Sequence, residues 1–324
     1  MLTPDVDETE LSEGCCDSLK QHAANFEALG VQFSILRWSR APLPLSSTNT
    51  VYVANLAWGY HTKISQWNLW LQSWPKSVHL INDPELLAWN TSKAYLKDLQ
   101  DAGIPILPTV FVDFIDESIL IEASKNFGVS DIIVKPQVSA SGDNTYRVLI
   151  DSDNIDSVTG SVIITRLSLG FTNFLFVSES ISRKEAIHRL KSTAEIGPFL
   201  VQPFMKSIWD EGEISVVVFD GQISHSVTKK AKLCDYRVQM EYGGTVERVE
   251  QLDSAVVDLV NKVLMACPKL PVYARVDILR NTLTGLLSIM ELEIIEPGFY
   301  LSFAPDNGLA FAKAIIKAST CIQK

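Results

Sequence analysis

Two pairs of charged residues near the C-terminus are the strongest candidates for chemistry. Arg275 and Asp277 are two positions apart in one apolar run, and Glu291 and Glu293 are two positions apart in the next. Residues two apart on a β-strand point to the same face, and a hairpin around residues 281–285 would pair the two strands. The pattern predicts three carboxylates and a guanidinium in a small volume, where the carboxylates could bind Mg²⁺. The alternative is a solvated strand face held by salt bridges.

Two lysines upstream stand where nucleotide phosphates could meet them. Lys135 ends an apolar run just before a loop of small residues that includes Ser139 and Gly142. Backbone N–H groups of such a loop can approach phosphate oxygens closely, and the lysine adds a positive charge. Lys93 lies near the start of a predicted helical segment. The alternative is a solvated strand end followed by an ordinary turn.

The middle of the chain holds two further candidates. The segment from Gln202 to Glu213 is typical of a linker that enters a new sheet, so its backbone could pair with an adenine edge while Glu213 holds ribose hydroxyls. An ordinary interdomain strand is the alternative. Arg237 precedes Gly243-Gly244 and could stabilise charge on a transferring phosphoryl group, or belong to a charged surface hairpin.

The composition excludes several classes of function. The 324 residues carry a net charge of −10 with a pI near 5.0, which argues against nucleic acid or an anionic membrane as the main partner. Residues 1–10 lack the apolar core of a secretory signal, and Arg166 interrupts the most apolar later stretch. The five cysteines form no CxxC pair and the histidines have no metal-ligand spacing. We expect a cytoplasmic protein with reduced thiols and no zinc site.

Hydrophobic periodicity indicates the elements that must position these residues. Strands at 30–36, 50–57 and 78–81 alternate with helices at 63–74 and 84–102, which predicts a small parallel sheet. Asp220-Gly221 is a hairpin signal. Further helices are expected at 116–127, 182–195, 251–266 and 306–318, and strands at 104–112, 131–135, 145–150, 199–205, 214–219 and 222–228.

Taken in order, the motifs resemble the ATP-grasp superfamily from about residue 50 to the C-terminus. Within it, the chain looks most like the glutathione-synthetase-like branch that includes the cycloserine-forming synthetase, because of the blocks 58–61, 89–96 and 224–227. The motifs are a lysine at a helix start, Val-Lys-Pro before a small-residue loop, Gln-Pro-Phe, Gly-Glu-x-Ser, Arg-Val-Gln with Gly-Gly, Arg-x-Asp, and Glu-x-Glu before Pro-Gly.

The resemblance implies a fold and a set of roles. The fold would be α/β (α+β), an ATP-grasp fold with a small N-terminal parallel-sheet (pre-ATP-grasp) domain. Residues 1–88 would form that domain with a polar tail, 89–201 the small lid subdomain and 202–324 the large C-terminal subdomain. The cofactor-binding roles would fall on Lys93 and Lys135 at the ATP phosphates, Ser139, Ser141 and Gly142 in the lid loop, Gln202 and Phe204 at the adenine, and Glu213 at the ribose. Asp277, Glu291 and Glu293 would hold two Mg²⁺ ions, with Mn²⁺ as an alternative, and Lys229, Arg237 and Arg275 would face the acyl phosphate and substrate.

The activity implied is that of an ATP- and Mg²⁺-dependent ligase. ATP would phosphorylate a carboxylate or amide-type oxygen of a small amino-acid-like substrate, and an amine-type nitrogen would then displace phosphate, in a ligation or a cyclisation. The protein would contribute positioning and charge neutralisation. A small-molecule kinase and a non-catalytic ATP-binding module are the alternatives. Family relatives are often dimers, so the resemblance also allows a homodimer.

Three features depart from the family pattern. Gly59 stands in the block Trp58-Gly59-Tyr60 where relatives commonly have aspartate, and Cys234 stands where glycine is expected. The stretch 152–180 fits the pattern poorly and looks like an insertion. The first two departures concern the identity of the substrate and not the binding of ATP.

Overall fold

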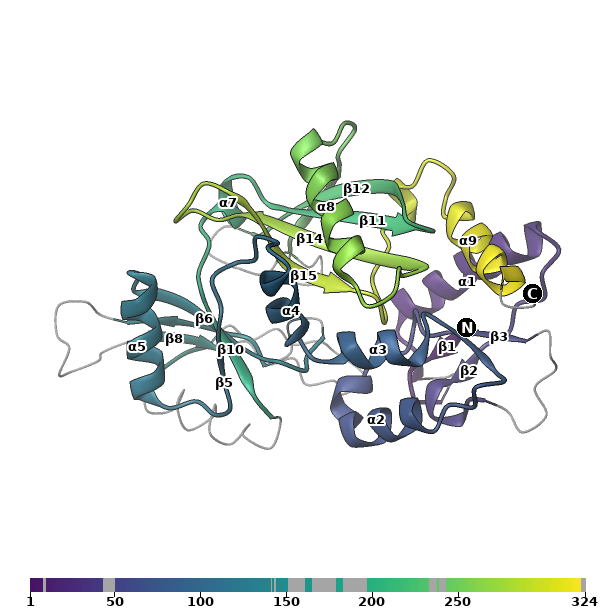
Figure 1. Cartoon of the computed structure of the whole chain (residues 1–324), viewed down its shortest axis with the longest axis horizontal. Helices are drawn as coiled ribbons and strands as arrows, with labels where there is room; N and C mark the ends of the chain where they lie inside the picture. Colours follow the sequence, from purple (N-terminus) through teal and green to yellow (C-terminus); the bar gives the residue numbers. More distant parts are fainter. Residues whose placement is uncertain are drawn as a thin grey trace.

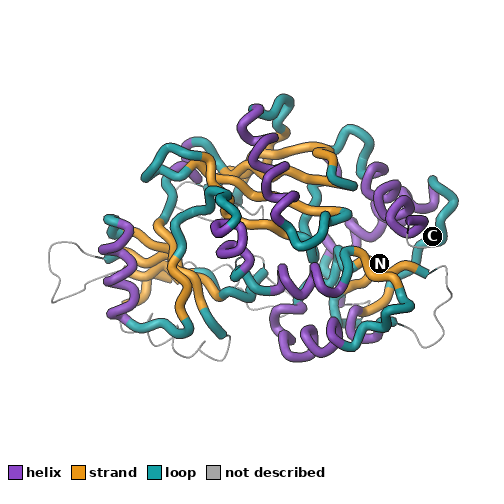
Figure 2. The backbone as a smooth tube through the Cα atoms, in the orientation of Figure 1, coloured by secondary structure: helices purple, strands orange, loops and turns teal. Residues whose placement is uncertain are grey.

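The chain forms a mixed α/β structure with two larger antiparallel sheets and two small parallel pairs of strands (Figure 1). The computed structural model describes residues 1–7, 10–42, 50–140, 142, 144–150, 161–164, 179–182, 197–232, 238 and 243–321. Beyond its first residue, the predicted helix at 182–195 lies outside this part, as do Cys234 and most of 152–180. Figure 2 shows the two larger sheets as separate groups of strands, each with a helix beside it.

The five-stranded sheet carries the charged residues of the C-terminal hairpin. Its strand order is β13-β12-β11-β14-β15, and every neighbouring pair is antiparallel. The predicted Asp220-Gly221 hairpin is confirmed, since it joins β11 to β12. The strands are β11 (Glu213–Phe219), β12 (Gln222–Lys230), β13 (Thr245–Arg248), β14 (Tyr273–Arg280) and β15 (Leu287–Glu293).

One face of this sheet is apolar because alternate residues of β11 and β14 are Val, Ala or Ile. Helix α8 (Ser254–Ala266) covers that face and begins at Asp253, whose side chain accepts the N–H of Ala255. Val260 and Val263 are fully buried against Val276, and each such side chain contributes about 1.5–3 kcal/mol. Burial of this face fixes the register, so the intervening charged residues must point to the opposite face.

The six-stranded sheet has the order β5-β10-β6-β7-β8-β9 and is also antiparallel. Helix α5 (Glu117–Phe127) packs on it through Leu120 and Ala123, against Ile132 and Val134. Two of its strands come from the stretch that fits the family pattern poorly. The strands are β5 (Val110–Val112), β6 (Asp131–Pro136), β7 (Tyr146–Leu149), β8 (Ser161–Ile164), β9 (Glu179–Ser182) and β10 (Phe199–Pro203).

The predicted small parallel sheet near the N-terminus is present. Strand β3 (Val51–Val53) pairs in parallel with β4 (His79–Ile81), and β1 (Leu2–Thr3) pairs in parallel with β2 (Leu36–Arg37). A cluster of tryptophans fills the core beneath them. The remaining helices are α1 (Glu13–Ala28), η2 (Trp38–Arg40), η3 (Tyr60–Lys63), α2 (Ile64–Gln72), α3 (Pro84–Thr91), α4 (Tyr95–Asp101), α7 (Ser207–Asp210), η6 (Leu301–Phe303) and α9 (Leu309–Cys321).

Three predicted elements differ in the structure. Of the expected strand 30–36, only Leu36 lies in a ladder, as the first residue of β2, because the apolar residues before it pack into side-chain clusters without a partner strand. The expected strand 104–112 is limited to β5 and a single bridge from Ile106 to Ile289. The expected helix 84–102 is broken at Ser92, which is extended, because the N–H of Lys93 donates to Gln137 instead of to a carbonyl of its own helix.

The three-part division at residues 88 and 201 stays a prediction. Helix α3 spans the first boundary, and it packs into two clusters: Leu86 joins the core beneath the five-stranded sheet, whereas Leu87 joins the N-terminal tryptophan cluster. The second boundary falls within β10 of the six-stranded sheet. In the described ranges, no helix is long and apolar enough to cross a membrane.

Candidate functional site

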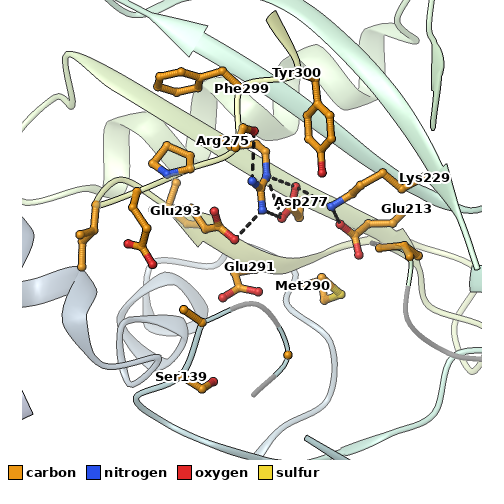
Figure 3. Close-up of a pocket in the computed structure, with 18 of the residues that line it drawn as sticks. Ser139, Glu213, Lys229, Arg275, Asp277, Met290, Glu291, Glu293, Phe299 and Tyr300 are labelled. Carbon is orange, nitrogen blue, oxygen red and sulfur yellow. Dashed lines mark hydrogen bonds and ion pairs between the residues drawn. The ribbon is translucent and has the colours of Figure 1, made fainter. Parts of the chain in front are cut away.

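Three carboxylates meet on the hairpin of β14 and β15. In the antiparallel register Asp277 lies opposite Glu291, and Arg275 lies opposite Glu293. One oxygen from each of the three carboxylates lies within 4.8 Å of the others. Figure 3 shows Glu291 on the side of the group that faces Ser139, with Arg275 and Asp277 joined by dashed lines. The structure therefore brings together the four residues that strand periodicity placed on one face.

Arg275 is held in the centre of this group by three partner residues. Its Nε and Nη2 atoms donate to the two oxygens of Asp277 at 2.9 and 2.8 Å, and Nη2 also donates to Glu293 at 2.5 Å. Its Nη1 donates to the carbonyl of Gly298 at 3.1 Å. The Ser215 hydroxyl on β11 donates to Asp277, which is 1% exposed. The bidentate contact between Arg275 and Asp277 fixes the orientation of the guanidinium as well as its position.

A second ion pair lies beside the first, between Lys229 and Glu213. The two residues are opposite each other on β12 and β11, and the Lys229 Nζ atom also lies 3.7 Å from Asp277. Gly212 makes this pairing sterically accessible, because a Cβ at its φ of +82° would come within 2.7 Å of the Lys229 carbonyl. Both side chains are nearly fully buried, so each charge depends on the other.

Lys93 reaches the same group from the break between α3 and α4. Its Nζ atom lies 3.1 Å from Glu291 and donates to the Ser139 carbonyl at 2.7 Å. Lys135 is buried at the end of β6, opposite Leu200 on β10. Burial lowers the pKa of Lys135, and the charge of Glu291 partly opposes that effect. The two lysines that the sequence associated with phosphate therefore flank one carboxylate.

Side chains from the broken helix secure the outer strand, β15. Asn90 donates to the Leu292 carbonyl at 2.8 Å and accepts the N–H of Ile294 at 3.1 Å. The Tyr95 hydroxyl accepts the N–H of Leu292 at 2.9 Å. These bonds replace the ladder that a further strand would supply, so the backbone around Glu291 and Glu293 is fixed.

The three carboxylates differ in acidity. Burial acts to raise the pKa of Asp277, but Arg275 and Lys229 outweigh it and lower the value to about 2. For Glu293, burial and the neighbouring carboxylates outweigh Arg275 and raise the pKa to about 7. Burial also acts to raise the pKa of Glu291, but Lys93 and Lys135 lower it. Such divergence is typical of functional sites.

The charged side chains described above line one pocket with a volume of about 560 Å³. Its walls come from both larger sheets, from α1, from the loop after β3 and from the loop after β15. A pocket of this size, with convergent charged groups, suits a small-molecule site.

The chain is similar in sequence and structure to several known proteins. Over 303 residues the chain is 22% identical to the cycloserine biosynthesis protein DcsG of Streptomyces lavendulae, with 89% of each chain covered. The crystal structure of D-cycloserine synthetase DcsG aligns with a TM-score of 0.71 at 19% identity, over 98% of this chain and 99% of that one. The ATP-grasp ligase PsnB aligns with a TM-score of 0.57 at 14% identity, over 93% and 95%.

The chain has the ATP-grasp fold. D-alanine–D-alanine ligase from Bacillus anthracis also aligns, with a TM-score of 0.61 at 16% identity, over 99% of this chain and 97% of that one. No model of a protein family matches the chain. The predicted fold class is confirmed, while the roles of individual residues stay predictions.

In this ATP-grasp frame, the residues expected at the adenine and ribose also line the pocket. Gln202, at the end of β10, donates to Thr109 at 2.8 Å, and Phe204 packs beside Trp209 and under Arg147. Gly142 lines the same space. Ser141 and Arg237 lie outside the described residues.

Tyr300 lines the pocket but was not among the site residues predicted from the sequence. Tyr300 has a left-handed backbone with φ of 51°, and its ring centroid lies 5.9 Å from both Lys229 Nζ and Arg275 Cζ. The residue before it, Phe299, is held by His225, whose Nε2 donates to the Phe299 carbonyl at 2.6 Å. In Figure 3 the Tyr300 ring points down between Arg275 and Lys229. The only available signal was the aromatic pair after Glu296-Pro297-Gly298.

Proposed function

We propose that this chain is an ATP- and Mg²⁺-dependent ligase. It activates a carboxylate or amide-type oxygen of a small amino-acid-like substrate and joins it to an amine-type nitrogen, with release of ADP and phosphate. The observation that carries the proposal is the meeting of three carboxylates and four cationic side chains in one pocket of an ATP-grasp fold.

The donor set supports a metal role for the three carboxylates. Asp277, Glu291 and Glu293 offer hard oxygen atoms on adjacent rigid strands, as Mg²⁺ requires, and these residues would hold the metal. A bound Mg²⁺ ion neutralises charge on phosphate oxygens.

The cationic residues have distinct tasks in the proposed reaction. Lys93 and Lys135 hold the phosphates of ATP, while Gln202, Phe204 and Glu213 bind the nucleoside. Lys229 and Arg275 neutralise charge on the phosphoryl group as it moves to the substrate oxygen. Nitrogen then displaces phosphate, and the protein supplies orientation and charge without a covalent bond of its own.

The comparisons support ligation over simple phosphoryl transfer. The similar proteins bear names of a synthetase and of ligases. One of the aligned structures holds ATP, and another holds ADP with Mg. The low identities leave the substrate of this chain to experiment.

The test measures ADP and phosphate release by the purified chain with ATP and Mg²⁺. Pools of amino acids, ureido-amino acids and small dipeptides serve as acceptors. Release of both products that depends on one pool supports the ligase. ADP release with a phosphorylated compound and no free phosphate would identify a kinase, and ATP binding without turnover in every pool would identify a binding module.

A further inference from the structure

The pocket extends past the metal carboxylates toward the N-terminal part of the chain. His22 of α1, Asn55 after β3 and Glu296 after β15 line this end. Trp58 closes one side, and its indole N–H donates to the Glu296 carbonyl at 3.3 Å. None of these residues belongs to the nucleotide or metal groups described above, so this end is free for the second substrate.

Two polar atoms at this end are buried without partners. His22 is 2% exposed and Asn55 is 1% exposed, and neither His22 Nδ1 nor Asn55 Oδ1 has a hydrogen-bond partner of normal geometry in the described ranges, although the Asn55 side chain lies close enough to act on the His22 ring. Asn55 donates from Nδ2 to the Pro297 carbonyl at 3.0 Å, which leaves Oδ1 as an acceptor. Burial lowers the pKa of His22 to about 4, although the neighbouring Asn55 amide opposes this, so the ring is neutral at pH 7.

Glu296 is the pocket carboxylate that forms no ion pair with a described cationic side chain. Across the described residues that line the pocket, the other four carboxylates pair with Lys93, Lys229 or Arg275. Glu296 makes no ion pair with another described residue. Burial and the charge of Glu293 raise the pKa of Glu296 well above the usual range, although the charge of Lys93 acts to lower it. The fourth cation, Lys135, interacts most strongly with Glu291.

We propose that the end of the pocket bounded by His22, Asn55 and Glu296 binds the ammonium group of the small substrate. The free atoms there can accept hydrogen bonds, and the Glu296 carboxyl group, whose ionised form is disfavoured by burial, has no cationic partner among the described residues. An ammonium group has three N–H donors and a positive charge, so it satisfies both needs, whereas a hydroxyl or carboxylate does not. The assignment rests on the proposed function, because the nucleotide must occupy the other end.

The test compares matched compounds that differ only in the ammonium group. Both enantiomers of alanine, serine, aspartate and phenylalanine are titrated into the protein, and their affinities are compared with those of lactate, glycerate, malate and phenyllactate. The wild-type chain is saturated with Mg²⁺ and ADP, and binding is measured by calorimetry. At least one amino acid should bind at least tenfold more tightly than its hydroxy counterpart. Equal binding within every pair, or no binding of any amino acid, would overturn the assignment.

Glu296→Gln tests the residue itself. The variant should weaken binding of the preferred amino acid at least tenfold and leave the affinity for ADP within twofold. Glu250→Gln, at a side chain that is 80% exposed, is the matched control and should change neither. An unchanged amino-acid affinity in Glu296→Gln contradicts the proposal. If the wild-type chain did not bind ADP at all, the proposed function would be contradicted instead. The comparison of amino acids with hydroxy acids uses only the wild-type chain, so it does not depend on the folding of a variant.

Discussion

Asp277, Glu291 and Glu293 share one face of a hairpin but not one electrostatic environment. Asp277 is ionised at any ordinary pH because Arg275 and Lys229 lower its pKa to about 2. Glu293 has its pKa raised to about 7 by burial and by the two other carboxylates. A metal that needs all three carboxylates ionised must therefore displace a proton from Glu293 near neutral pH.

Mg²⁺ affinity should increase with pH through about 7. Glu293 is mostly protonated at pH 6 and mostly ionised at pH 8, so the apparent affinity should rise by about tenfold between them. Calorimetric titration of Mg²⁺ in the presence of a non-hydrolysable ATP analogue measures this change. In Glu293→Gln the pH dependence should flatten, and a wild-type affinity that is constant from pH 6 to 8 would contradict the shared metal role.

Glu291→Gln should stop turnover with little loss of stability. The substitution keeps the shape of the side chain but removes a charged metal ligand, so phosphate release should fall at least about 100-fold, or about 2.7 kcal/mol. The melting temperature should stay within a few degrees, because the lost ion pair with Lys93 is partly offset by a retained hydrogen-bond acceptor. Near-normal turnover in this variant would show that Glu291 does not hold metal.

At the scale of elements, the site depends on how an outer strand is held. Strand β15 has β14 on one side only, and its other side is bonded to Asn90, to Tyr95 and to the segment around Ile106. The break between α3 and α4 therefore does two things. It turns Asn90 and Tyr95 toward β15, and it directs Lys93 to Glu291.

Asn90→Ala should loosen the proposed metal site through the backbone of β15. It leaves the Leu292 carbonyl and the Ile294 N–H without their partner, and the free energy of unfolding should fall by about 2–4 kcal/mol. The Mg²⁺ concentration needed for half-maximal turnover should also rise. Asn68→Ala, at an exposed position of α2, is the control and should change stability by less than about 0.5 kcal/mol. Equal denaturation curves for the two variants would contradict this role of Asn90.

At the scale of the whole molecule, the pocket joins parts that are distant in the sequence. Its lining includes the six-stranded sheet, the five-stranded sheet and helix α1. The described part of each sheet has its own apolar cluster. A ligand that contacts Lys135 on one sheet and Glu291 on the other therefore stabilises the arrangement of both.

Nucleotide should raise the melting temperature, and Lys135→Ala should reduce that rise. At 100 times its Kd, ADP with Mg²⁺ adds about 2.7 kcal/mol, which corresponds to roughly 5 °C. Loss of the Lys135 contact should weaken binding about tenfold, which removes about 1.4 kcal/mol of the stabilisation. Thermal denaturation with and without nucleotide measures both, with the exposed Lys317→Ala as the control. If nucleotide raised the melting temperature equally in the wild type, Lys135→Ala and Lys317→Ala, a phosphate role for Lys135 would be excluded.

Features that depend on near neighbours in the chain could be predicted from the residues alone. The two-residue spacing of Arg275 with Asp277, and of Glu291 with Glu293, sets each pair on one face, and Asp220-Gly221 ends one strand and starts the next. The ordered motifs also predicted the ATP-grasp fold. These inferences succeed because strand periodicity and turn chemistry are local properties of the backbone.

Contacts between distant segments became visible only in the folded chain. The helix at 84–102 is broken because Gln137 competes for the N–H of Lys93, and residues 31–35 form no strand because no partner strand pairs with them. The positions of Tyr300 and Glu296 in the pocket depend on where the loop after β15 meets Arg275, Asn55 and Trp58. Such contacts join residues as many as 242 positions apart, and no local pattern of residue types encodes which of them will meet.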